Sequence, residues 1–529
     1  MATSYGKSIF KGAAILTVAG VITRILGFVY RIFMSNIMGA EGMGLYQLIM
    51  PIYMLAWSIS CSGFNTAVSK LIAQERVKGE YGNMGRVLKQ AVMITTCIGL
   101  LLTAVLYLGA ELIAVYIIRD VRATMPLRIL SLAFPFMAAG TCVRGYFIGL
   151  QETTVPAINQ VLEQFVRMAI VYALAGSFMH RGLEFACAVA VVGIVAEEIF
   201  SFFYISISYK RHKKKTQHTK PAVYSSKVVW GMLLAMAVPL TANRVTGSLL
   251  SAWENVLIPG RLQLAGMSAQ EAMSTFGRLT GMAMPLVYFP TAMLTALSVT
   301  LVPAVSEAVT TKDYSSIANT ASKSVLFASI CGMGAAALFI VFPNELGQVI
   351  YNQHIGYMLM MMGVLCPLLY IQIVFAGILN GLGCQVFIFR NSLISSLISI
   401  GFIFFLVPHF GIAAYIIGTF VSLLVVCSLE LAKIRETIQL EVSILNWIAK
   451  PILAAVMAGV AARVAADQLF SPLPAPIGLT LGIVVLMSMY GLVIILTGCL
   501  SKSDLQTFAR FLPTPKTPQV MPLNRAVSK

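Results

Sequence analysis

Charged side chains are scarce in this 529-residue chain. Asp, Glu, Lys and Arg together make up 11% of it, whereas 58% of the residues are hydrophobic. A soluble domain this apolar could not cover its surface with polar groups, which excludes an assembly of ordinary soluble domains. The longest hydrophilic segments, 209–227 and the tail 500–529, are too short to fold as separate domains. The chain is therefore expected to be a membrane protein.

Sequence motifs for metals, disulfides and nucleotides are missing as well. The nine Cys residues are scattered singly, without a CxxC pair or a His–Cys spacing. Gly79, Gly82 and Gly85 lie in a polar loop, and no GxxxxGK[ST] sequence is present to bind a nucleotide phosphate. We expect no metal, no cofactor and no enzymatic activity.

Apolar runs are abundant. Each run has about 20 residues, which is enough for a helix to cross the hydrocarbon core of a bilayer. They predict an all-α, polytopic membrane protein with about 14 transmembrane helices. The expected spans are 10–36, 44–70, 88–110, 126–149, 154–178, 182–208, 228–257, 276–304, 322–343, 355–381, 389–407, 411–431, 449–467 and 476–499.

The basic residues indicate the orientation of these helices. The 37 Lys and Arg outnumber the 20 Asp and Glu, for a net charge of +17. Most of them fall in alternate loops, as the positive-inside rule requires, so we do not expect nucleic-acid binding. The run KRHKKKTQHTK at 210–220 is expected to anchor the topology near anionic membrane lipids, with a regulatory or partner-binding role as the alternative. We expect a multi-pass protein of the cytoplasmic membrane with both termini in the cytoplasm.

The two halves of the chain contain an internal repeat. Four positions recur with the same spacing after a shift of 232 residues: Pro135, Gly145, Gly149 and Leu150 match Pro367, Gly377, Gly381 and Leu382. Six helices separate the copies, so the copies share one orientation and form a parallel repeat about an axis along the membrane normal. Chance matching of Pro and Gly is the alternative.

The repeat predicts two pseudo-symmetric six-helix lobes around a central cavity, followed by two C-terminal helices. The expected N-lobe is 1–227, which includes a basic cytoplasmic linker, and the expected C-lobe is 228–448. The appended helices are expected over 449–499, and a cytoplasmic tail over 500–529.

Arginine occurs inside the apolar runs. Arg24 and Arg31, seven residues apart, share one helix face, and Arg278 and Arg244 lie within runs of the second half. A guanidinium at membrane depth is costly and normally faces a cavity or a partner, so these residues predict a positively charged cavity, with helix packing as the alternative.

Polar residues at steps of three, four and seven extend this prediction to neighbouring helices. Gln47 and Asn65 lie on one polar stripe, and Asn255 lies on a second stripe together with Arg244. The Ser and Thr residues on these stripes are more typical of helix packing. The candidate substrate-binding residues are Arg24, Arg31, Arg244, Arg278, Gln47, Asn65 and Asn255.

Four acidic residues within the apolar runs are candidates for coupling to an ion: Glu163, Glu197, Glu198 and Glu254. Glu163 is expected to pair with Arg167, four residues further along the same helix. Glu197 or Glu198 could titrate if buried, or could reach water at the helix end instead. Glu254 alternatively neutralises a nearby arginine.

Short motifs carry a family resemblance. They are FKG at 10–12, TRILGF at 23–28 with YR at 30–31, GAEGMGLY at 39–46, GRLTG at 277–281 through FP at 289–290, and LVPAVSE at 301–307. The chain resembles the stage V sporulation protein B-like members of the polysaccharide exporter and lipid II flippase branch of the multidrug/oligosaccharidyl-lipid/polysaccharide (MOP) exporter superfamily.

The resemblance implies a flippase that moves an undecaprenyl-pyrophosphate-linked sugar across the membrane by alternating access, in cell-wall or spore cortex synthesis. Arg24 and Arg278 match positions where lipid II flippases have cavity arginines, and arginine binds diphosphate oxygens bidentately. A further arginine of that pattern falls on Tyr30, with Arg31 one step on, and the second helix has none.

The expected partners are an anionic lipid-linked sugar and membrane lipids, with coupling to Na⁺, H⁺ or the membrane potential. The alternative function is a MATE-like cation-coupled antiporter of small molecules or drugs. Cationic cargo calls for buried carboxylates, whereas arginines occupy the expected cavity helices. A non-transporting scaffold of the sporulation membrane is a third possibility.

Overall fold

The computed structural model describes residues 2–178, 181–216 and 223–499. These residues form helices joined by short turns and contain no β-strand, so the predicted all-α class is confirmed. The expected tail 500–529 lies outside the described residues, as does part of the predicted linker.

The helices of the first half include short 3₁₀ or π segments, which are marked η. They are α1 (Ala2–Trp57), η1 (Ser58–Ser62), α2 (Gly63–Lys78), α3 (Tyr81–Leu112), η2 (Ile113–Ile118), η3 (Val121–Ala123), α4 (Thr124–Ser131), α5 (Phe134–Gly149), α6 (Thr154–Phe178) and α7 (Leu183–Thr216).

The second half begins with α8 and ends with α20. Its helices are α8 (Ser226–Leu264), α9 (Ala269–Gly277), η5 (Arg278–Ala283), α10 (Met284–Tyr288), α11 (Thr291–Thr310), α12 (Tyr314–Val341), α13 (Pro343–Tyr351), α14 (Gly356–Gly363), α15 (Cys366–Gly381), α16 (Gln385–Gly401), η6 (Phe402–Leu406), α17 (Val407–Phe410), α18 (Ile412–Ile438), η7 (Leu445–Ala449), α19 (Lys450–Ala465), η8 (Ala466–Phe470) and α20 (Ala475–Leu496).

Eleven of the described helices are long and apolar enough to cross a membrane, or up to 13 if each of two bent pairs is one span. The multi-pass prediction is confirmed, and the count of 14 stays a prediction.

The stretch Ile15–Lys78 has 64 residues. At 1.5 Å per residue this is about 96 Å of helix, which is too long for one crossing. Gly39, with φ 69° and ψ −174°, kinks it into two legs that match the predicted spans 10–36 and 44–70.

The helix predicted over 276–304 is interrupted, because α10 ends at Tyr288 and α11 begins at Thr291 after Pro290. Phe289 and Pro290 keep right-handed helical backbone angles, so a single crossing over this range stays a prediction. Proline has no backbone N–H to donate and is favoured where a helix starts. The helix predicted over 182–208 is longer than expected, because α7 continues to Thr216. Lys and Arg are good helix formers, so a basic run can extend a helix beyond its apolar part.

The internal repeat corresponds to two equivalent pieces of structure. α5 and α15 each have 16 residues and begin with a proline in the first turn. Each forms a bent pair with the helix before it, at 44° and 50° respectively. Gly145 of α5 packs closely against Asn65, and the matching Gly377 of α15 packs against Ser298. This equivalence of contacts favours a true repeat over chance matching.

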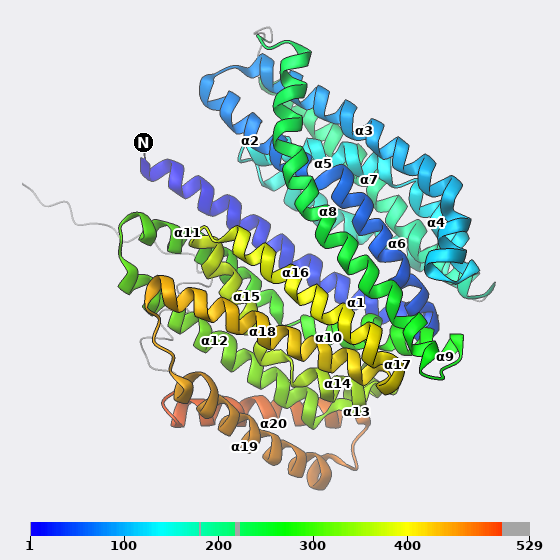
Figure 1. The fold of residues 1–529 in the computed structure, drawn as a ribbon, viewed down its shortest axis with the longest axis vertical. Coiled ribbons are helices and arrows are strands. Elements are labelled where there is room, and N and C mark those ends of the chain that lie inside the picture. Colours follow the sequence, from blue (N-terminus) through cyan, green and yellow to red (C-terminus); the bar gives the residue numbers. More distant parts are fainter. Residues whose placement is uncertain (1, 179–180, 217–222, 500–529) are drawn as a thin grey trace, which may run out of the picture.

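Figure 1 shows two groups of helices, with the first leg of α1 running between them. α2 to α7 lie in one group, and α11 to α18 lie in the other, where α19 and α20 pack together at its edge. α8 packs on α1, α2 and α3 but also touches α16 and α17. The predicted boundary between 227 and 228 therefore stays a prediction, because the first helix beyond it contacts both groups.

α9 and η5 pack tightly against α1 just after its kink. A methyl group on Gly277 would collide with the carbonyl oxygen of Ala40, and one on Gly44 with the carbonyl of Met273. Glycine at both positions allows the two backbones to touch, as in other closely packed membrane helices. We call these contacts the α1–α9 seam; they join a helix of the first half to a helix of the second half.

Candidate functional site

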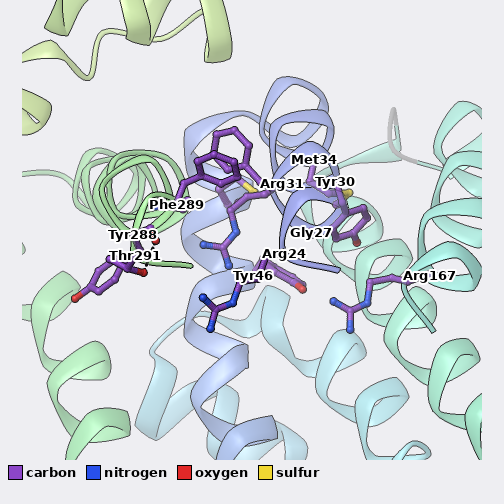
Figure 2. Close-up of a pocket in the computed structure, with 13 residues that line it drawn as sticks. Arg24, Gly27, Tyr30, Arg31, Met34, Tyr46, Arg167, Tyr288, Phe289 and Thr291 are labelled. Atoms are coloured by element: carbon purple, nitrogen blue, oxygen red, sulfur yellow. Dashed lines mark hydrogen bonds between the residues drawn. The ribbon is translucent and has the colours of Figure 1, made fainter. Parts of the chain in front are cut away.

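A cavity of about 380 Å³ beside the first leg of α1 has three arginines in its wall. Arg24 and Arg31 come from one face of α1, and Figure 2 shows their guanidinium groups extending in the same direction. Arg167 reaches the cavity from α6, on the other side of Tyr30. We call this space the arginine cavity. Arg24 is exposed and Arg31 half-buried, and neither has a carboxylate partner among the described residues.

Aromatic side chains bring the second half of the chain to the arginine cavity. Tyr288 ends α10, and Phe289 follows it; both line the space. The ring of Phe289 lies 4.6 Å from that of Phe28 on α1, centroid to centroid. The cavity is therefore built from both halves of the chain, which is the arrangement that alternating access requires.

A second cavity, of about 560 Å³, lies between the second leg of α1 and α8. Arg244 and Asn255 of α8 and Gln47 of α1 line it, so three further candidate residues share one space. The hydroxyls of Ser58 and Ser248 in its wall are 2.6 Å apart and connect the two helices. Gln47 also donates a hydrogen bond to the carbonyl of Thr280 at 2.9 Å.

Arg278 and Asn65 line neither of these two cavities. Arg278 begins η5 and is half-buried, and its Nε has no hydrogen-bond partner within the described part of the chain. Asn65 lies inside the first half, where it packs against Gly145. A role for either residue in substrate binding stays a prediction.

The acidic candidates of α6 and α7 belong to a buried network of ion pairs. Arg167 donates two hydrogen bonds to Glu197 of α7, one of them from Nε to Oε2 at 2.6 Å. Glu163 pairs instead with Arg144 of α5, at 2.5 Å. The predicted Glu163–Arg167 pair is therefore wrong. α7 packs along α6, so Glu197 meets the edge of the guanidinium and accepts two hydrogen bonds from it, a geometry that a neighbour on the same helix cannot easily reach.

Neutral polar groups complete this network. Asn159, fully buried, donates to Glu163 at 2.7 Å and to Ser201 at 2.8 Å. Glu198 accepts a hydrogen bond of 2.6 Å from the hydroxyl of Tyr53 on α1. The side chain of Glu197 is only 5% exposed, which excludes the alternative that it reaches water at the helix end. A role in ion coupling stays a prediction for these carboxylates.

Glu254 lies apart from this network, on α8. No arginine pairs with it among the residues that the structure describes. The alternative that Glu254 neutralises an arginine is thus unsupported.

Sequence reasoning missed Arg167 as a cavity residue, although its position inside an apolar run carries the same signal as that of Arg24.

The fold and these cavities define a class of protein: a polytopic membrane transporter with polar space between two helical bundles. The family described as polysaccharide biosynthesis protein matches residues 9–309, more than half of the chain. The chain belongs to this family, and its relatives include a stage V sporulation protein and a lipid II flippase.

Two relatives from Bacillus subtilis (strain 168) illustrate the similarity. Stage V sporulation protein B is 29% identical over 443 residues, which cover 83% of this chain and 86% of the relative. Lipid II flippase MurJ is 27% identical over 335 residues, which cover 58% of this chain and 59% of the relative.

Solved structures share the fold. Lipid II flippase MurJ in an inward closed conformation aligns with 91% of this chain and 99% of its own, with a TM-score of 0.68 and 13% identity. An inward-facing MATE family multidrug resistance transporter of the MOP superfamily aligns with 79% of this chain and 94% of its own, with a TM-score of 0.62 and 14% identity. At these identities the likeness shows the two-bundle fold alone.

Proposed function

We propose that the protein is a flippase for an undecaprenyl-pyrophosphate-linked sugar, which it moves across the cytoplasmic membrane by alternating access during peptidoglycan or polysaccharide synthesis. The convergence of Arg24, Arg31 and Arg167 on one cavity carries this proposal. Guanidinium groups bind phosphate oxygens bidentately, and a diphosphate supplies the negative charge that Arg24 and Arg31, which have no carboxylate partner among the described residues, require at membrane depth. The similarity to stage V sporulation protein B and to a lipid II flippase supports the same class of cargo.

The proposed orientation has both termini in the cytoplasm. The basic residues around the α2–α3 turn and at the end of α7 support it through the positive-inside rule. In Figure 1 the N-terminal end of α1 lies at the opposite end of the molecule from α9. The α1–α9 seam would then close the extracellular end, and the cavities would receive cargo from the cytoplasmic side. This is the inward-facing state of an exporter.

The second candidate function is a cation-coupled drug antiporter, which the fold of the MATE neighbour permits. A cationic drug needs carboxylates or aromatic faces in the cavity. The arginine cavity has aromatic rings, but its charged groups are guanidiniums, and Glu197 behind it is already paired with Arg167. The electrostatics therefore favour an anionic headgroup over a cationic one.

Transport in proteoliposomes distinguishes the two functions. The full chain would be reconstituted with a fluorescent undecaprenyl-pyrophosphate-linked sugar in one set of vesicles and with a cationic dye in another. We expect protein-dependent movement of the lipid-linked sugar and none of the dye. Movement of the dye alone would overturn the flippase proposal in favour of the antiporter.

A further inference from the structure

One arginine belongs both to the arginine cavity and to the buried ion-pair network. Arg167 lines the cavity together with Arg24 and Arg31, and Figure 2 shows it entering from the side opposite to their guanidinium groups. Its own guanidinium is held by two hydrogen bonds to Glu197. Because Glu197 is almost fully buried, water cannot readily replace Arg167 as its partner.

Charged and titratable groups surround the Arg167–Glu197 pair. They are Glu163 of α6, Glu198 of α7 itself, and Tyr30, Tyr46 and Tyr53 of α1. The other elements packed on α7 carry arginines with partners of their own: Arg144 of α5 pairs with Glu163, Arg128 of α4 with Glu111, and Arg122 of η3 with Asp120 and Glu41. Among the described residues, Arg167 is therefore the guanidinium that neutralises Glu197.

We infer that a diphosphate in the arginine cavity competes with Glu197 for Arg167, and that Glu197 takes up a proton when it loses this competition. The inference rests on the proposed function. A phosphate oxygen that captures the guanidinium leaves a carboxylate ion buried without a counter-charge, which is too costly to persist, so the carboxylate is neutralised by a proton from water. When the cargo leaves, Arg167 returns to Glu197 and the proton is released.

The direction of this linkage follows from the order of events. Cargo binding consumes a proton, so cargo affinity rises as the pH falls. Proton and cargo are bound together, so each exported cargo carries a proton out of the cell. An inward proton gradient would therefore oppose export rather than drive it. The Arg167–Glu197 pair thus tunes affinity for the headgroup and does not supply the driving force.

Calorimetry on the full chain in detergent measures the linkage directly. The probe is a farnesyl-pyrophosphate-linked N-acetylglucosamine, whose phosphate diester groups keep their charge through neutral pH. Titrations in buffers with different ionisation enthalpies report the number of protons taken up per bound probe. We expect uptake approaching about one proton near neutral pH, and tighter binding at lower pH.

Glu197→Gln separates this explanation from other titrating groups. The variant should bind the probe with no proton uptake and about tenfold tighter at alkaline pH, because Arg167 no longer has to leave a charged hydrogen-bonded partner. Glu345→Gln, which removes a carboxylate from the exposed pair with Arg463, is the matched control and should keep the wild-type proton uptake. Glu197→Asp retains a titratable group and should keep proton uptake as well, which provides a test if the Gln variant does not fold.

The outcomes separate the inference from the proposed function. Tight binding of the probe by the wild type without proton uptake at any pH would overturn the inference and leave the flippase proposal standing. Proton uptake that is unchanged in Glu197→Gln would also overturn it. A wild-type protein that does not bind the probe at all would overturn both.

Discussion

Arg24 is exposed in a cavity wall and has no carboxylate partner among the described residues. Such a charge is expensive at membrane depth unless an anion binds it. Arg24→Ala should lower transport of the lipid-linked probe at least about tenfold, the scale expected for one charge-assisted hydrogen bond. Arg24→Lys should keep part of the activity, because an ammonium group is a point charge without the planar fork. Rates in proteoliposomes, normalised to reconstituted protein, provide the measurement.

Arg463→Ala is the control for Arg24→Ala. Arg463 lies on α19, where it forms exposed pairs with Glu345 and Asp467 away from both cavities. Exposed pairs contribute little to stability, so this variant should transport normally. Full activity of Arg24→Ala at normal abundance would leave helix packing as the role of Arg24.

Arg144 and Arg128 compare a buried ion pair with an exposed one. Arg144 pairs at 2.5 Å with Glu163, which is 17% exposed, whereas Arg128 lies 3.7 Å from Glu111, which is 71% exposed. Arg144→Ala should lower the free energy of unfolding by about 3 kcal/mol, because it leaves the largely buried Glu163 carboxylate without a counter-charge while Asn159 and Ser201 still donate hydrogen bonds to it. Arg128→Ala should lower it by less than about 1 kcal/mol. Thermal unfolding of the purified proteins measures both, and equal shifts would contradict a stabilising network.

Sequence spacing located cavity residues better than it located their partners. Arg24 and Arg31 were expected on one face of a helix, and the structure places both in one cavity wall. The partner of Arg167 was expected four residues away on the same helix, but it comes from α7. Helical periodicity determines which residues share a face, whereas the choice of ion-pair partner depends on which neighbouring helix packs there, which a single sequence does not show.

At the scale of elements, the α1–α9 seam depends on glycine. Gly277→Ala would place a methyl group against the carbonyl of Ala40, so it should destabilise the state in which this seam is closed. A cysteine introduced at Met273, which is buried against Gly44 within the seam, then reports on the seam. We expect faster labelling of this cysteine in the Gly277→Ala background.

Gly231→Ala is the matched control, because Gly231 lies on α8 with open space where a methyl group would stand. Alanine is a better helix former than glycine, so this variant should fold normally and leave the labelling rate unchanged. The same labelling rate in both variants would show that the seam does not limit opening.

The apolar runs predicted the existence of most helices but not how they begin, end and kink. The prediction of two spans before residue 70 holds because Gly39 interrupts a helix that would otherwise be continuous. The helix predicted over 276–304 is interrupted, because Pro290 has no backbone N–H to continue the helical hydrogen bonds. Hydropathy records the length of apolar sequence, whereas a break depends on backbone conformation at one or two residues.

The orientation of the whole molecule is open to a direct test. With both termini in the cytoplasm, a single cysteine at Lys214 near the end of α7 should resist a membrane-impermeant label added to intact cells. A single cysteine at Ser268, in the turn between α8 and α9, should react with it. The physical reason is the concentration of basic residues on the side that faces the cytoplasm. Labelling at position 214 and protection at 268 would reverse the orientation.

The two-bundle fold was predictable because the repeat of Pro and Gly positions reflects equivalent bent pairs, α4–α5 and α14–α15. The division between the bundles was harder to predict. α8 belongs by sequence to the second repeat, yet it packs on α2 and α3 as well as on α16. The contacts between two such bundles differ between inward-facing and outward-facing states of a transporter. One sequence serves both states, so it does not show which bundle α8 contacts in either of them.

The central claim is that the arginine cavity binds an anionic headgroup that the protein moves across the membrane. Two fluorescent lipids with the same polyprenyl chain and the same sugar, one joined by a pyrophosphate and the other by a neutral linker, test it in proteoliposomes that contain the wild-type protein. We predict rapid protein-dependent flipping of the pyrophosphate lipid and flipping of the neutral lipid at least about tenfold slower, because only the former engages the guanidinium groups. Equal rates for the two lipids would contradict the claim.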